Sequence, residues 1–180
     1  VTGEQRRRAK AVNFGIVYGL SDFGLARDLG ISRKEAAGYI ECYFARYHGV
    51  REFLDKTVAN AHASGYVTTL YGRRRDLPAL RSRNFMQRSF AERMAMNTPI
   101  QGTAADLIKI AMIRADAALR AAHVKSRILL QVHDELVLEA VEAEIKEVSD
   151  ILRTAMSGAA ELAVPLAVDV HTGKNWAEAK

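Results

Sequence analysis

Four side chains that could take part in binding or catalysis recur every four residues near the start of the sequence: Arg6, Lys10, Phe14 and Tyr18. In an α-helix each residue turns by about 100°, so this spacing places all four along one face. The two cations can bind a triphosphate, and the two rings can stack on a nucleobase or a sugar. The alternative is an amphipathic helix with a basic flank and two aromatic rings in the core.

A second candidate is the run His133-Asp134-Glu135, which lies between two stretches rich in Leu and Val. Carboxylates beside apolar strands are costly unless their charge is compensated, and a divalent cation is a natural partner. The alternative is an ordinary exposed hairpin turn, where Asp is a preferred residue. Both interpretations predict two strands joined by a polar three-residue tip.

Amides and arginines form a third group of candidates. Asn97 and Gln101 lie one helical turn apart on either side of Pro99. Amides at this spacing can read hydrogen-bond acceptors in the minor groove of DNA, or they can satisfy backbone groups freed by Pro99. A run of arginines can neutralise backbone phosphates or form a solvated face. Its members are Arg73, Arg74, Arg75, Arg81, Arg83, Arg88 and Arg93.

The elements expected to position these residues indicate an α+β fold. Helices are predicted over residues 4–18, 32–47, 50–63 and 142–156, with Gly49 ending the second. A long helical pattern over 84–121 is expected to be interrupted and kinked at Pro99 and Gly102. Hairpins are predicted near 66–75 and over 128–140, and a closing strand over 164–170. Helices alternating with antiparallel hairpins are typical of α+β proteins.

Composition limits the kind of protein. The 180 residues are 49% hydrophobic and 26% charged, as in an ordinary globular protein, and no apolar run approaches the roughly 20 residues of a membrane span. The lone Cys42 and a start without an export leader favour a cytosolic setting. Residues 1–100 carry 17 Lys and Arg against 9 Asp and Glu, whereas residues 101–180 carry 9 against 12. This asymmetry favours a polyanionic partner held on one side.

Three segments in this order resemble the family A DNA polymerases, the bacterial DNA polymerase I type. They are Arg6 to Gly19, Asn97 to Asp106, and Gln131 to Leu136. The resemblance implies helical fingers over residues 1–82 and the carboxy-terminal part of a palm over 83–180. In that palm an antiparallel hairpin packs on the long kinked helix.

The resemblance also implies roles on the first helix. Arg6 and Lys10 contact the triphosphate of an incoming dNTP, and Lys10 also protonates the departing pyrophosphate. Phe14 packs on the incoming sugar and base, where a phenyl ring favours substrates with a 3′-hydroxyl over dideoxy analogues. Tyr18 occupies the template base site until the fingers close.

For the palm, the resemblance implies that Asp134 is a ligand of catalytic Mg²⁺ and that Glu135 supports the primer end. Two metal ions then assist the attack of the primer 3′-oxygen on the α-phosphorus. The residues implied to hold the primer-template DNA are Arg75, Arg93, Asn97, Gln101 and His133.

One departure from the family pattern concerns the second catalytic aspartate. In the family it lies upstream, in an Asp-Tyr-Ser-Gln-Ile-Glu type motif that this sequence does not contain. We therefore expect the chain to need the upstream remainder of the same polymerase and to be inactive alone. One alternative is a non-catalytic nucleic-acid-binding module that keeps the polymerase shape. Another is a segment of a phage or organelle replicase.

Overall fold

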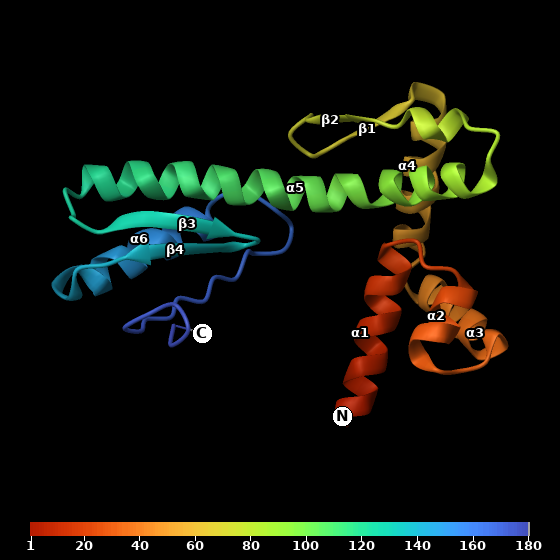
Figure 1. The fold of residues 1–180 in the computed structure, drawn as a ribbon, viewed down its shortest axis with the longest axis horizontal. Helices are drawn as coiled ribbons and strands as arrows, with labels where there is room; N and C mark the ends of the chain where they lie inside the picture. Colours follow the sequence, from red (N-terminus) through yellow and green to blue (C-terminus); the bar gives the residue numbers. More distant parts are fainter. Residues whose placement is uncertain (180) are drawn as a thin grey trace. The chain divides into compact units, whose positions relative to one another are not determined.

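The computed structural model describes residues 1–179, which form two compact units: unit 1 ends at Gly102 and unit 2 begins at Thr103. Unit 1 contains α1 (Gly3–Val17), α2 (Asp22–Leu29), α3 (Arg33–Arg46), α4 (His48–Ser64), β1 (Tyr66–Thr68), β2 (Arg74–Asp76), η1 (Pro78–Arg81) and the first half of α5 (Phe85–Ala121). Unit 2 contains the second half of α5, β3 (Arg127–Val132), β4 (Glu135–Glu139), η2 (Glu142–Glu144) and α6 (Ile145–Ser157). Helices with two antiparallel two-stranded sheets confirm the α+β prediction (Figure 1).

Helix α1 has defined local signals at both ends. Thr2 caps its start, accepting the Gln5 N–H, while the Gln5 side chain accepts the Thr2 N–H. The helix ends before Gly19, whose φ of +70° favours glycine. Its inner face, which includes the buried Ile16, turns towards α2 and α3. The remaining face is left open to solvent.

A small apolar cluster joins α2, α3 and the inner face of α1. Its buried members are Leu25, Ala26, Leu29 and Ala36, and Ala11, Val12, Leu20, Ile31 and Ile40 pack around them. Helix α2, which begins with Ser21 accepting the Gly24 N–H, was not among the predicted helices. The predicted capping box at the start of α3 is confirmed on one side, because Ser32 accepts the Glu35 N–H.

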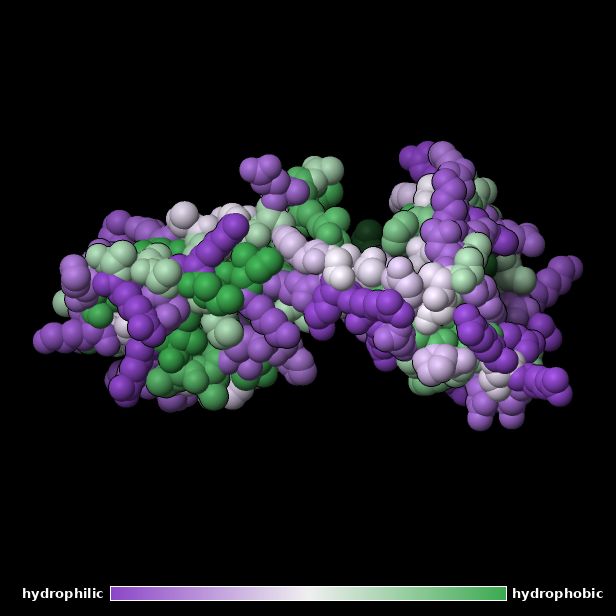
Figure 2. Space-filling model, turned by 90° about the horizontal axis from the view of Figure 1, so that it is seen from above, coloured by the Kyte–Doolittle hydropathy of each residue, from purple (hydrophilic) through white to green (hydrophobic). Residues whose placement is uncertain are grey.

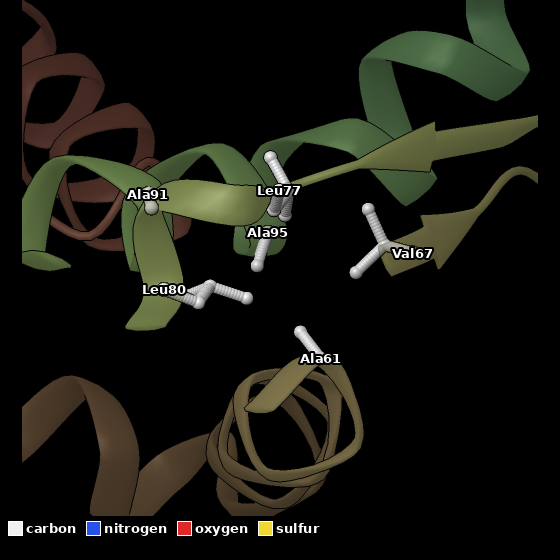
Figure 3. Close-up of a cluster of buried hydrophobic side chains, with 6 residues drawn as sticks. All are labelled: Ala61, Val67, Leu77, Leu80, Ala91 and Ala95. Carbon is white, nitrogen blue, oxygen red and sulfur yellow. The ribbon is translucent and has the colours of Figure 1, made fainter. Parts of the chain in front are cut away.

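The β1–β2 hairpin is held on α4 and the first half of α5 by a second cluster. Figure 3 shows these side chains meeting between the elements. The buried members are Ala61, Val67, Leu77, Leu80, Ala91 and Ala95. Three of the six are alanines, so helix α4 and helix α5 can approach each other closely. The prediction that Gly49 ends a helix was wrong: the chain breaks at Tyr47, and Gly49 lies inside α4.

Helix α5 runs unbroken for 37 residues, so neither Pro99 nor Gly102 interrupts it. Side chains bind the backbone around this point. Thr98 donates its hydroxyl to the Met94 carbonyl (2.6 Å), and Arg73 of the hairpin donates to the Gly102 carbonyl (2.9 Å). Neither bond replaces the one lost at Pro99, whose missing N–H leaves the carbonyl of Ala95, four residues earlier, without its helical donor.

In unit 2 the β3–β4 hairpin packs with the second half of α5 and with α6. The buried members of this core are Ala115, Leu119, Val148, Leu152 and Ala155, and Val124, Ile128, Leu136, Leu138 and Ile151 complete it. The predicted strand over residues 164–170 was wrong, because this segment joins no ladder of the described structure. A strand requires a hydrogen-bonded neighbour, which its own alternation cannot supply. No described helix has the length and apolarity needed to cross a bilayer.

Candidate functional site

The predicted stripe on α1 is exposed. Phe14 is 54% exposed and Tyr18 is 38% exposed, while Ile16 on the opposite side is buried. The Phe14 and Tyr18 rings lie nearly parallel, with centroids 6.2 Å apart and planes 16° apart. The alternative of two core aromatic rings is therefore wrong. A helix that displays two large rings to solvent has a surface suited to stacking on a flat ligand.

The cations at the start of α1 divide into two sets. Glu4 accepts two hydrogen bonds from Arg7 (2.8 Å each) and one from Arg8 (2.9 Å). The hydrogen bonds from Arg7, followed by those from Arg8, lower the pKa of Glu4 from 4.5 to about 2. Arg6 and Lys10 are exposed and make no side-chain hydrogen bond or ion pair with any described residue. The cations that the stripe predicted for phosphate binding are thus the ones available to a ligand.

The end of α1 lies against α5. A Cβ atom on Gly19 would stand 2.9 Å from the Met96 sulfur and 3.2 Å from Arg93 Cγ at a φ of +70°, so glycine is strongly favoured here. Tyr18, which precedes Gly19, is consequently held near the same turn of α5. Arg93 donates to the Ser89 hydroxyl (3.1 Å), and its guanidinium lies 5.9 Å from the Phe90 ring centre. This contact brings the α1 stripe beside one of the predicted DNA-binding residues.

The two predicted amides differ in their surroundings. The Asn97 Oδ1 atom is buried and has no hydrogen-bond partner, whereas Gln101 is exposed. Among the described residues, neither amide bonds to the backbone, and Thr98 is the residue that supports the Met94 carbonyl. Their proposed structural role in satisfying freed backbone groups is therefore not seen. A buried acceptor without a partner is costly, which favours a donor supplied by a ligand or by water.

The arginines of the β1–β2 hairpin bind protein groups. Arg75 Nη1 donates to the Thr98 hydroxyl (3.2 Å). Arg74 pairs with Asp76 (2.6 Å), and its guanidinium lies 3.9 Å from the Tyr66 ring centre. Part of the arginine run is therefore structural, holding the hairpin on α5. Arg75 is exposed and uses one of its five N–H groups in this bond, so the others remain able to face a phosphate.

In unit 2 the polar tip is a two-residue turn, His133-Asp134, rather than the predicted three-residue tip. Glu135 already belongs to β4 and pairs with Val132. His133 has a φ of +52°, and its carbonyl accepts a hydrogen bond from the Gln131 side chain (2.6 Å). Asp134 and Glu135 are exposed and make no side-chain hydrogen bond or ion pair with the described residues. The turn therefore presents open carboxylate oxygens.

The carboxylates of Asp134 and Glu135 are the kind of ligand that Mg²⁺ prefers, but they are too few to form a complete site. Mg²⁺ prefers hard oxygen ligands in an octahedral set and is often bound through one or two carboxylates. Within residues 1–179 there is no group of three His, Cys, Asp or Glu side chains that could hold a metal ion. Asp134 is suited to supply part of such a set and cannot supply it alone.

Named proteins of similar sequence match this chain along nearly its whole length. The family model for DNA polymerase family A matches residues 1–178. The chain is 55% identical to DNA polymerase I of Lactococcus lactis subsp. lactis and 57% identical to that of Geobacillus stearothermophilus, each over 180 residues. It is 52% identical over 179 residues to the Pseudomonas aeruginosa protein of the same name. In each comparison the match covers at least 99% of this chain and 20% of the relative, so the chain spans about a fifth of their length.

A solved structure agrees with these relatives. It is described as the POL domain of Pol1 from M. smegmatis in complex with DNA primer-template and dNTP. The two chains are 51% identical with a TM-score of 0.96, and the match covers 99% of this chain and 32% of the other. Sequence and fold thus agree over nearly every residue. The chain belongs to DNA polymerase family A.

Proposed function

We propose that this chain is the nucleotide-binding part and one portion of the catalytic part of a DNA-directed DNA polymerase. The complete enzyme adds dNTPs to a primer 3′-hydroxyl under the direction of a template. The observation that carries this proposal is the exposed stripe on α1, with two unengaged cations followed by two stacked rings. The mycobacterial relative, described as a complex with DNA primer-template and dNTP, supports the choice of partners.

On α1 the chemistry follows the order of the side chains. Arg6 and Lys10 bind the triphosphate, and the Lys10 ammonium gives a proton to the departing pyrophosphate. Phe14 packs on the incoming sugar and base. Tyr18 holds the template base position until the helix closes over a correct pair, so selection follows from induced fit.

The DNA contacts lie on α5, the β1–β2 hairpin and the tip of β3–β4. Arg93 lies beside the end of α1, and the Asn97 acceptor lacks a protein donor. A base edge or an ordered water in the minor groove supplies such a donor. The proposed set of primer-template contacts is Arg75, Arg93, Asn97, Gln101 and His133.

At the β3–β4 tip, Asp134 would hold Mg²⁺ and Glu135 would support the primer end. When bound, two Mg²⁺ ions neutralise the charge on the attacking and leaving oxygens. Asp134 contributes an exposed carboxylate, and the pairing of Val132 with Glu135 sets where that carboxylate stands. Because residues 1–179 hold no group of three potential ligands, the other ligands come from elsewhere in the polymerase.

Residues 1–82 would form fingers and residues 83–180 part of a palm, with the upstream remainder of the polymerase as their partner. Unit 2 shows a surface in need of such a partner, because hydrophobic residues gather on its visible face (Figure 2). Leu129 and Leu130 of β3 are each 50% exposed. The named relatives are bacterial, so we place the enzyme in the bacterial cytoplasm, at the nucleoid, in DNA replication and repair.

A second candidate function is a nucleic-acid-binding module without catalysis. The basic first 100 residues favour it. The two functions differ in what Asp134 does. In a polymerase this carboxylate is essential for turnover, whereas in a binding module its loss leaves DNA affinity intact and has no turnover to affect.

The test uses the full-length polymerase that contains this segment. We expect Asp134→Asn to lower kcat for primer extension by about 100-fold or more, the scale seen when one electrostatic stabiliser of a transition state is removed, with primer-template affinity nearly unchanged. Asp169→Asn, a matched change at an exposed aspartate, should leave both unchanged. Full activity of Asp134→Asn contradicts the proposal. The purified 180-residue chain should show no Mg²⁺-dependent extension.

A further inference from the structure

The open end of the β3–β4 hairpin, opposite the tip, is closed by a buried serine. Ser126 directly precedes β3 and is 5% exposed. Its hydroxyl accepts the N–H of Val141, which follows β4, at 3.0 Å, and it donates to Glu144 Oε2 at 2.6 Å. One side chain therefore joins the two chain segments that enter and leave the hairpin.

Glu144, the last residue of η2, completes this arrangement. Its carboxylate also accepts the backbone N–H groups of Lys125 (3.0 Å) and Ser126 (2.9 Å). The Ser126 hydroxyl, followed by the Lys125 amide, lowers the pKa of Glu144, so the group is a carboxylate at neutral pH. The start of β3 is thus tied to the start of α6, which packs in the core of unit 2.

The pairing of β3 with β4 needs such an anchor. The ladder has an irregularity between Ile128 and Leu130, which leaves Leu129 without a partner. Leu129 and Leu130 are both 50% exposed, so among the apolar residues of the hairpin it is Ile128, Leu136 and Leu138, packed in the core of unit 2, whose burial favours the observed pairing. The turn, by contrast, is a weak determinant, because His133 adopts a positive φ without being a glycine.

A change of pairing by one residue moves a different residue into the turn. The observed pairing Val132 with Glu135 leaves His133 and Asp134 at the tip. A slip of the whole ladder by one residue therefore displaces Asp134 and turns successive side chains to the opposite face. The hydrogen bonds of Glu144 hold the open end of the hairpin and so help to fix the position of Asp134 at its other end.

We propose that Glu144, together with Ser126, is a positioning residue that sets the pairing of the β3–β4 hairpin and hence the place of the Asp134 carboxylate. This inference rests on the proposed polymerase function. It predicts that Glu144 affects turnover without touching DNA, dNTP or metal.

The test compares variants of the full-length polymerase by kinetics and by amide hydrogen exchange. Glu144→Ala should lower kcat about tenfold and raise the Mg²⁺ concentration at half-maximal rate, with the dNTP KM unchanged, as for outer residues that orient a metal ligand. Exchange of the amides from Gln131 to Leu136 should become faster without metal or DNA. Glu144→Gln should bring both the kinetics and the amide exchange much closer to those of the wild type, because an amide oxygen still accepts the two backbone N–H groups.

Two further variants keep the test decisive. Glu142→Ala, on the same short helix, is the matched control, because Glu142 is exposed and bonds to no described side chain or amide through its carboxylate. Ser126→Ala is a milder version that should act in the same direction if Glu144→Ala does not fold. Wild-type kinetics and exchange in Ser126→Ala and in folded Glu144→Ala overturn the inference.

Asp134→Asn, measured in parallel, separates this inference from the function on which it rests. If Asp134→Asn abolishes extension while Glu144→Ala behaves as wild type, the positioning role alone is wrong. If Asp134→Asn is fully active, the proposed function itself is wrong. Faster exchange confined to α6 with unchanged kcat would show that Glu144 supports the helix only, and it also overturns the inference.

Discussion

Helix α1 and the β3–β4 hairpin both present charged groups to solvent, but they place them in different ways. On α1 the helical period puts Arg6 and Phe14 on one face, and the buried Ile16 on the other face fixes which side is outward. At the hairpin tip, Asp134 stands where it does because of strand pairing. A helix therefore places its residues locally, whereas the hairpin depends on contacts about ten residues away.

The largest effect that tests this comparison is an exchange of the two turn residues, His133→Asp together with Asp134→His. Composition and charge stay the same, and aspartate tolerates the φ of +52° at position 133 better than most residues. We expect the hairpin to fold and kcat of the full polymerase to fall about 100-fold or more, because the carboxylate has moved by one position. Steady-state primer extension measures the loss.

Circular dichroism serves as the control for folding of the exchanged variant and should match the wild type, whereas DNA affinity should fall modestly, because His133 is one of the proposed primer-template contacts. Turnover close to that of the wild type would mean that the tip needs only a carboxylate nearby. The contrast between a position-dependent hairpin and a locally determined helix would then be lost.

How far the sequence predicts the site follows from the same contrast. The helix over residues 4–18 was predicted to within one residue of Gly3–Val17, because its caps and its period are all local. The tip was predicted as three residues and has two, because Glu135 pairs with Val132 across the hairpin. The contact of Gly19 with Met96 was not predicted, since the two residues lie far apart in the sequence.

Elements whose local pattern is short or ambiguous were also missed or predicted wrongly. Helix α2 has only eight residues, too few for a clear period. The alternation over residues 164–170 resembles a strand, but pairing depends on a neighbour that the pattern does not reveal. Gly49 was read as a helix end, although the break is the non-helical backbone of Tyr47 (φ −119°, ψ 57°).

The next largest effect concerns the cations of α1. Arg6→Ala should raise the dNTP KM by about 10- to 100-fold, the value of a charge-assisted hydrogen bond to phosphate. Arg7→Ala is the matched control, because Arg7 binds Glu4 and an exposed ion pair contributes little. Single-turnover kinetics at varied dNTP measures both. Equal effects of the two variants would show that only the total charge matters, against a face-specific role.

A smaller effect is expected at the contact between α1 and α5. Gly19→Ala places a Cβ 2.9 Å from the Met96 sulfur at a φ of +70°. Gly30→Ala has a similar φ of +67° with no atom within 4 Å, so it carries the backbone strain alone. Urea unfolding should show a loss of about 1–2 kcal/mol for Gly30→Ala and a larger one for Gly19→Ala. Equal losses would mean that the Met96 contact does not constrain α1.

The smallest effect is the pH dependence of the start of α1. The pKa of Glu4 in the folded chain, about 2, lies below its ordinary value of 4.5 because Arg7 and Arg8 hydrogen-bond the carboxylate. Because the pKa is lowered, the contribution of the ionised Glu4 carboxylate to the stability of the fold is fully present above pH 4.5 and is lost as the pH falls towards 2. An NMR titration of the Glu4 carboxyl should give this low midpoint, and high salt should raise it, since exposed ion pairs are screened.

Glu4→Gln should abolish the titration without altering the dNTP KM, because Arg6 and Lys10 do not depend on Glu4. A raised KM in Glu4→Gln would instead show that the Glu4 carboxylate and the cations proposed to bind phosphate form one network, and that even the helix does not place these cations purely by spacing.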